Sequence, residues 1–222
     1  THLRFEYITG HHILERYGMT ETNMNTSNPY RGERRAGTVG FPLSGVELKI
    51  TDSATGATLP QNEVGQIEVR GPNVFKGYWN MPEKTAEELH EDGFFITGDL
   101  GQIDAEGYLH IVGRNKDLII SGGYNIYPKE IELLLDIQEG VLESAVVGVP
   151  HPDFGETVIG VLVADTGAEP DLKAIKQAIA TSLARFKQPQ KLILLQELPR
   201  NTMGKVQKKA LREQFSDLFV TK

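Results

Sequence analysis

The pattern of apolar residues changes at about Gly113, and this change constrains the fold more than any other feature. Before it, short alternating runs at 45–51 and 65–71 are separated by frequent Gly and Pro, as in strands joined by tight turns. After it, apolar residues recur at helical spacing and alternate with β-branched runs. We therefore expect an α+β chain in two parts, cut near Gly113.

The first part predicts a helix followed by a small antiparallel subdomain. The helix covers residues 1–10 and stops at Gly10, and a short strand follows at 12–18. The run at 101–113 predicts a hairpin with its turn at 104–107, and Pro82 opens a short helix. Closely spaced Gly and Pro favour a β-barrel-like or twisted sheet here.

The second part predicts a compact α+β module of three strands with helices. β-branched runs mark strands at 143–149, 156–165 and 191–195. Helices are expected at 127–140, at 171–186 with Asp171 as N-cap, and at 206–215. We interpret the charges of the last helix as a solvated face; these are Lys208, Lys209 and Arg212.

The composition excludes several classes of protein. A net charge of −7 argues against a general nucleic-acid surface. The absence of cysteine excludes disulfides and thiolate metal sites and fits a cytoplasmic protein. No apolar run approaches the roughly 18 residues that a membrane span needs. Because residue 1 is Thr and not Met, we expect this chain to be the C-terminal piece of a longer protein.

The segment YGMTET at 17–22 groups two hydroxyls and a carboxylate after a predicted strand. Thr20 is suited to a phosphate, Glu21 to Mg²⁺, and Tyr17 to stacking on a base. A polar turn without a ligand is the alternative. In TGDL, Asp99 is able to accept from two adjacent ribose hydroxyls, or it is simply a turn residue.

Two further segments carry candidate residues. GRNKDLIISGGYN at 113–125 offers Arg114, a permanent cation, and two glycines that let a backbone approach a ligand; a charged linker is the alternative. In NTMGK, Lys205 is a point charge on a long stem, and Gly204 predicts a mobile turn.

The order of these segments is more specific than any one of them. The series YGMTET, GYWNMPEKT, TGDL, GRNKDLIISGGYNIYP and NTMGK resembles the motifs of the AMP-forming acyl-CoA synthetases, the adenylate-forming superfamily. Within it, HHILERYGMTETNMNTSNPY, AGTVGFPLSGVELKI and NTMGKVQKKALREQF look like malonyl-CoA synthetases. The resemblance covers nearly the whole chain. It implies Mg²⁺ as cofactor. It implies ATP, CoA and a small carboxylic acid such as malonate or methylmalonate as substrates.

The resemblance also implies a role for each candidate residue around the nucleotide. Tyr17 would pack on adenine, and Thr20 would contact the α-phosphate. Glu21 would bind Mg²⁺. Asp99 and Arg114 would hold the ribose hydroxyls. Residues 1–112 would then be the C-terminal part of the large AMP-binding domain.

Residues 113–222 would form the mobile C-terminal domain of such an enzyme. Lys116 would be its hinge, and the loop of Gly122, Gly123 and Tyr124 would border the CoA tunnel. Lys205 would be the lysine of the adenylation step. Such lysines are silenced by acetylation in related synthetases, so a lysine acetyltransferase is an expected partner.

Part of the family pattern is absent from these 222 residues. The glycine- and threonine-rich phosphate loop does not occur, nor does most of the acyl pocket, so we expect no synthesis by this polypeptide alone. Arg34 and Arg35 are the nearest candidates for a second substrate carboxylate, although a surface loop is the preferred interpretation. Another acyl- or aryl-CoA ligase and a non-catalytic nucleotide-binding or docking module remain alternatives. A metal hydrolase is disfavoured because only His11 and His12 are paired.

Overall fold

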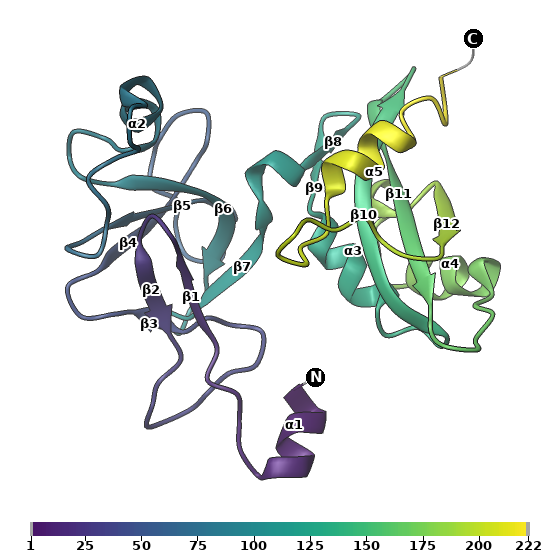
Figure 1. Ribbon diagram of the computed structural model, residues 1–222, viewed down its shortest axis with the longest axis horizontal. Coiled ribbons are helices and arrows are strands. Elements are labelled where there is room, and N and C mark those ends of the chain that lie inside the picture. Colours follow the sequence, from purple (N-terminus) through teal and green to yellow (C-terminus); the bar gives the residue numbers. More distant parts are fainter. Residues whose placement is uncertain (1, 221–222) are drawn as a thin grey trace. The chain divides into compact units, whose positions relative to one another are not determined.

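The computed structural model describes residues 2–220, and the chain divides into two compact units, Thr1–Asn115 and Lys116–Lys222 (Figure 1). The division falls between Asn115 and Lys116, whereas the sequence pattern placed the cut at Gly113. No helix among residues 2–220 is long and apolar enough to cross a membrane.

The first unit begins with the predicted helix. Helix α1 spans His2–Thr9, and Gly10 ends it with φ of +68°, a value that glycine adopts without strain. The strand expected at 12–18 begins only at Arg16, where β1 (Arg16–Met19) starts.

Two open antiparallel sheets make up most of the first unit. β1, β2 (Asn23–Ser27) and β3 (Phe41–Pro42) form the smaller sheet. The larger has the order β4-β5-β6-β7, and its strands are Glu47–Thr51, Gly65–Arg70, Phe95–Ile103 and Leu109–Arg114. Of the two predicted forms, a barrel-like subdomain and a twisted sheet, the structure has open sheets: β4 and β7 do not pair among the described strands, so no closed barrel forms. The predicted hairpin and the short helix, α2 (Pro82–Glu88), are confirmed.

Side chains from one face of the larger sheet form the core of the first unit. Alternation along each strand sends these residues to the same side, as the sequence predicts for the strands at 45–51 and 65–71. The buried members are Ile50, Ile67, Val69, Phe95 and Leu109, with Tyr17 and Met19 of β1 packed against them.

The second unit contains a five-stranded sheet rather than the expected three-stranded one. β10 (Val141–His151), β11 (Gly155–Ala164) and β12 (Lys191–Leu195) are the predicted strands. β8 (Ile119–Ser121) and β9 (Tyr124–Ile126) add a hairpin, in the order β10-β11-β8-β9 with β12 also on β11. Strands of three residues are too short for alternation to be recognised in sequence.

Helices cover both faces of this sheet. On one face, α3 (Pro128–Leu135) and α4 (Leu172–Ala180) bury apolar side chains against Val146, Val158 and Leu162. On the other, Leu211 of α5 (Lys208–Gln214) packs with the alternate residues of β10 and β11. Figure 1 shows α5 lying across β10 and β11.

Two helices of the second unit are shorter than expected. The Asp171 side chain caps α4 by accepting hydrogen bonds from the backbone N–H groups of Lys173 and Ala174, which confirms the predicted N-cap. However, α4 ends at Ala180, and a 3₁₀ turn (Arg185–Lys187) completes the segment. α3 similarly ends at Leu135, before the predicted stop at Gly140.

Candidate nucleotide site and terminal lysine

A bulge in β6 sets the position of Asp99. Between the pairs Gln66–Leu100 and Glu68–Ile96, β5 contributes residue 67 alone, while β6 contributes 97–99. Gly98 makes this possible with φ of +71°. The Thr97 hydroxyl accepts from the Asp99 N–H at 3.2 Å and donates to the Ile67 carbonyl at 2.9 Å. Asp99 therefore lies within a strand and not in a turn.

Three predicted site residues meet at this bulge. The Tyr17 hydroxyl donates a hydrogen bond to Oδ2 of Asp99 at 2.7 Å. Arg114 is the cross-strand partner of Asp99, and its Nε lies 3.2 Å from Oδ1. The Asp99 side chain is 9% exposed and that of Arg114 is 52% exposed. Strand register thus brings residues 82 positions apart into one cluster.

The cluster keeps hydrogen-bonding capacity for a ligand. An ionised carboxylate has about four acceptor sites, so Asp99 is able to accept from two further hydroxyls. The terminal nitrogens of Arg114 form no hydrogen bond within residues 2–220. Burial, together with the neighbouring charge of Asp99, raises the pKa of Tyr17, so this phenol stays protonated and acts as a donor.

Thr20 and Glu21 follow β1 and are not bonded to this cluster within the described residues. Thr20 is exposed, and the Glu21 carbonyl accepts from the Phe75 N–H at 2.8 Å. Tyr78 donates to Oε2 of Glu88 at 2.6 Å and lies 3.4 Å from Oε1 of Glu21. Burial and the bond to Glu88 raise the pKa of Tyr78. The sequence pattern did not single out either residue: Tyr78 lies within GYWNMPEKT, whereas Glu88 lies three residues after that segment.

The predicted CoA-loop residues form the tip of the β8–β9 hairpin. Gly122 and Gly123 have φ of +56° and +83°, the left-handed values of a type I′ turn. A Cβ on Gly123 would meet nothing within 4 Å in this chain. Tyr124 is 56% exposed and stacks on Phe186, with ring centroids 4.5 Å apart. The loop presents open backbone beside an aromatic pair.

Lys205 lies in an exposed turn between β12 and α5. Its neighbour Val206 packs into the core, and Arg200 and Val206 form a β-bridge. Successive residues of extended chain point to opposite sides, so anchoring Val206 turns Lys205 toward solvent. Backbone N–H groups within the turn donate hydrogen bonds to Oδ1 of Asn201 and organise it. The mobility expected from Gly204 stays a prediction.

Two family profiles match the chain. The one described as AMP-binding enzyme matches residues 1–79, and the one described as AMP-binding enzyme C-terminal domain matches residues 130–205. The chain belongs to the AMP-binding enzymes. It is 44% identical over 221 residues to a malonate–CoA ligase of Arabidopsis thaliana, across 95% of this chain and 36% of the relative.

Other AMP-binding enzymes show a range of named substrates. A long-chain-fatty-acid–CoA ligase of Bacillus subtilis is 40% identical over 212 residues, with 95% of this chain and 38% of the relative covered. Among solved structures, ATP-bound MatB from Rhodopseudomonas palustris is 59% identical with a TM-score of 0.94. The match covers 98% of this chain and 43% of MatB. The chain thus spans less than half the length of these relatives.

The predicted hinge residue, Lys116, lies at the boundary between the two units. It is exposed and forms part of a 3₁₀ turn, Asn115–Asp117. The next residue, Asp117, accepts a hydrogen bond from Nη1 of Arg212 in α5 at 3.1 Å. The end of the boundary segment is thereby fastened to the last helix of the second unit.

The solvated-face interpretation of α5 is wrong for two of its three cations. Lys208 Nζ lies 2.6 Å from Oε1 of Glu132, with side chains 18% and 9% exposed, respectively. Arg212 is paired with Asp117. Only Lys209 is largely exposed. The predicted exposure failed because α5 packs on the sheet through Leu211, which places Lys208 near Glu132 and Arg212 near Asp117.

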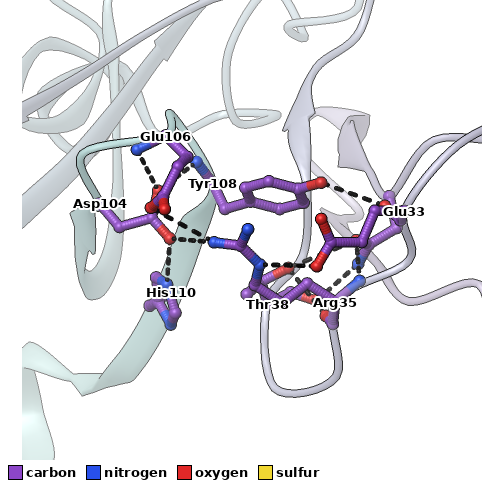
Figure 2. A network of polar contacts seen from close by, with 8 residues as sticks. Glu33, Arg35, Thr38, Asp104, Glu106, Tyr108 and His110 are labelled. Atoms are coloured by element: carbon purple, nitrogen blue, oxygen red, sulfur yellow. Dashed lines mark hydrogen bonds and ion pairs between the residues drawn. The ribbon is translucent and has the colours of Figure 1, made fainter.

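Arg35 is held within a polar network of the first unit (Figure 2). Its guanidinium lies 3.3 Å from Asp104 and 4.2 Å from the ring centroid of Tyr108. Arg34 donates to backbone carbonyls, including that of His12 at 2.9 Å. Both arginines hold loops together, which agrees with the surface-loop interpretation. Residues 2–220 contain no group of three or more acidic or histidine side chains that could hold a metal.

Proposed function

We propose that this chain forms the nucleotide- and CoA-handling part of an AMP-forming acyl-CoA ligase. A protein containing it would join a small carboxylic acid, malonate or methylmalonate, to CoA with release of AMP and pyrophosphate. In this proposal the unit ending at Asn115 belongs to the large AMP-binding domain. The unit from Lys116 onward is the mobile C-terminal domain.

The cluster of Tyr17, Asp99 and Arg114 is the observation that carries this proposal. A buried carboxylate with free acceptor sites, flanked by a cation and a protonated phenol, suits a vicinal diol such as that of ribose. Family membership and 59% identity to an ATP-bound protein support adenosine as the source of that diol. In this proposal the ring of Tyr17 packs on adenine and Thr20 contacts the α-phosphate.

Adenylation is the first half-reaction. The substrate carboxylate attacks the α-phosphorus of ATP, the bond to the β-phosphate breaks, and pyrophosphate leaves. Both reactants are anionic, so an ammonium that contacts both would offset their repulsion. Lys205 fits this role because its side chain is exposed on an ordered turn and makes no ion pair within residues 2–220.

Thioester formation is the second half-reaction. The CoA thiolate, whose proton has gone to water, attacks the acyl carbon; the bond from that carbon to the phosphate oxygen breaks, and AMP leaves with the bonding electrons. The lysine is not needed in this step. We propose that the second unit turns at Lys116, withdrawing Lys205 and bringing the loop of Gly122, Gly123 and Tyr124 to the CoA path.

Mg²⁺ would be held by Glu21 together with the phosphates of ATP. One carboxylate plus phosphate oxygens is a common donor set for this ion, which keeps several waters. The part-exposed carboxylate of Glu21 fits such a shared site and not a cage built by protein alone. When bound, the ion would neutralise phosphate charge.

The acid substrate is tested most directly with a full-length protein that contains this chain. Pyrophosphate release is measured with Mg-ATP and, separately, malonate, methylmalonate, a medium-chain fatty acid and benzoate. CoA is then added and thioester formation is followed. We expect the highest kcat/KM with malonate or methylmalonate. A preference for the fatty or aryl acid would assign the protein to another ligase class.

A non-catalytic module is the remaining alternative, and the same assay separates it from an enzyme. Binding of ATP without pyrophosphate release from any acid would favour the module. Asp99→Ala tests the nucleotide site in the same assay. We expect it to raise the KM for ATP by at least tenfold, because the carboxylate that would accept from the ribose hydroxyls is lost.

Acetylation of Lys205 is a proposed means of control. Acetylation removes the charge on which the first half-reaction would depend, and the exposed turn is accessible to a modifying enzyme. Full adenylation activity in protein that mass spectrometry shows to be acetylated at Lys205 would refute this control.

A further inference from the structure

One side chain, that of Asn201, organises the turn that carries Lys205. Its Oδ1 accepts hydrogen bonds from the backbone N–H groups of Met203 at 3.0 Å and Lys205 at 2.9 Å. The backbone N–H of Asn201 donates to the Lys205 carbonyl at 2.9 Å. Asn201 therefore holds Lys205 through both the N–H and the C=O of that residue.

The base of the turn is tied to the sheet. Nη1 of Arg200 donates to the Gly204 carbonyl at 2.6 Å, and the same guanidinium forms an ion pair with Glu143 of β10. On the other side of the turn, Val206 packs with the core of the second unit. These contacts fix the ends of the turn, so that its tip depends on Asn201.

We propose that Asn201 is a positioning residue for Lys205. The inference rests on the proposed adenylation role of Lys205. A lysine side chain has four rotatable bonds, so its ammonium reaches a defined point only if its Cα is held in place. Without the Asn201 acceptor, the backbone N–H groups of Met203 and Lys205 would hydrogen-bond to water instead, and the position of the Lys205 Cα would be less restricted. No other side chain in residues 2–220 accepts from these two N–H groups.

The test compares both half-reactions in a full-length protein that contains this chain. Asn201→Ala removes the acceptor, Asn201→Asp keeps a carboxyl oxygen at the same place, and Thr202→Ala is a matched control at an exposed neighbour. We expect Asn201→Ala to lower kcat for pyrophosphate release about tenfold to a hundredfold. Thioester formation from supplied acyl-adenylate should stay within about threefold. Asn201→Asp and Thr202→Ala should keep both rates within about threefold.

A double-mutant cycle with Lys205→Ala separates positioning from general structure. If Asn201 acts through Lys205, adding Asn201→Ala to Lys205→Ala should lower the residual adenylation rate by less than twofold. Equal losses in both half-reactions, or a full additional loss in the double variant, would overturn the inference. So would an Asn201→Ala protein with wild-type adenylation.

Hydrogen exchange gives a readout that does not depend on the substrate. In Asn201→Ala the amides of Met203 and Lys205 should exchange at least tenfold faster, while amides of β10 and β11 should be unchanged. Unchanged exchange at both turn amides would overturn the inference by itself. A wild-type protein that forms no acyl-adenylate from any acid would instead remove the proposed function.

Discussion

The ammonium of Lys208 lies 2.6 Å from Oε1 of Glu132, so an ion pair fastens the last helix to α3. The same oxygen accepts from the Val146 N–H at 3.0 Å. β10 pairs with β11 alone among the described strands, which leaves the outer edge of β10 without a strand partner. Glu132 thus accepts a hydrogen bond from a backbone N–H on the free edge of β10 and also pairs with the lysine that begins α5.

The first prediction concerns this pair. Lys208→Met should lower the free energy of unfolding by about 2 kcal/mol, because it removes the nearer cation of the buried Glu132 carboxylate and leaves only the half-exposed Lys129, whose Nζ lies 3.9 Å from Oε2. Urea unfolding of the chain, followed at the transition of the second unit, measures the change. Lys209→Met is the control, since Lys209 is 82% exposed, and it should stay within about 0.5 kcal/mol. A Lys208→Met protein as stable as this control would contradict the prediction.

The second prediction concerns pH and Asp104. Burial acts to raise the pKa of Asp104, but the hydrogen bond from His110 and those from two backbone N–H groups outweigh it, so the pKa lies below its ordinary value of 3.8. A lowered folded-state pKa contributes stability above the ordinary value, and this contribution is lost as pH falls through the folded-state pKa. Asp104→Asn should therefore flatten the acid side of the stability curve between about pH 5 and pH 3.

Urea midpoints at several pH values check this prediction. Glu63→Gln is the control at an exposed carboxylate, and it should keep the wild-type slope. An Asp104→Asn curve parallel to the wild type throughout the acid range would show that this carboxyl does not carry the dependence.

The third prediction concerns Lys205 in a full-length protein. Lys205→Ala should lower the adenylation rate about a hundredfold, because one preorganised charge at a phosphoryl centre is lost. CoA attack on supplied acyl-adenylate should stay within about threefold. Pyrophosphate release and thioester formation are measured separately, with Lys209→Ala as the control. If both half-reactions fell equally, the assignment of Lys205 to one step would fail.

The fourth prediction concerns Gly123, also in a full-length protein. Gly123→Val should slow thioester formation at least tenfold more than adenylation, because the side chain would stand on the loop proposed to border CoA. The substitution also strains the backbone, since φ is +83°. Gly167→Val is the matched control: Gly167 has φ of +77°, and a Cβ there also meets nothing within 4 Å. Similar kinetics for both variants would attribute the effect to strain alone.

The local pattern of apolar and polar residues was sufficient to predict many helices and strands of this chain. Alternation identified the strands at 45–51 and 65–71, and apolar periodicity with a capping aspartate identified the start of α4. These features depend on neighbours along the chain, which the sequence displays directly. The order of the short motifs was likewise sufficient to indicate the family, and the two profiles confirm it.

Contacts between distant residues were decided by the tertiary structure alone. Strand register and a bulge at Gly98 bring Tyr17 and Arg114 to Asp99, and no local pattern encodes that meeting. Packing of α5 on the sheet turned Lys208 from an expected surface charge into half of an ion pair. The physical reason is the same in both cases. A residue's spacing reports which side of its own element it occupies, whereas its partner depends on how separate elements pack.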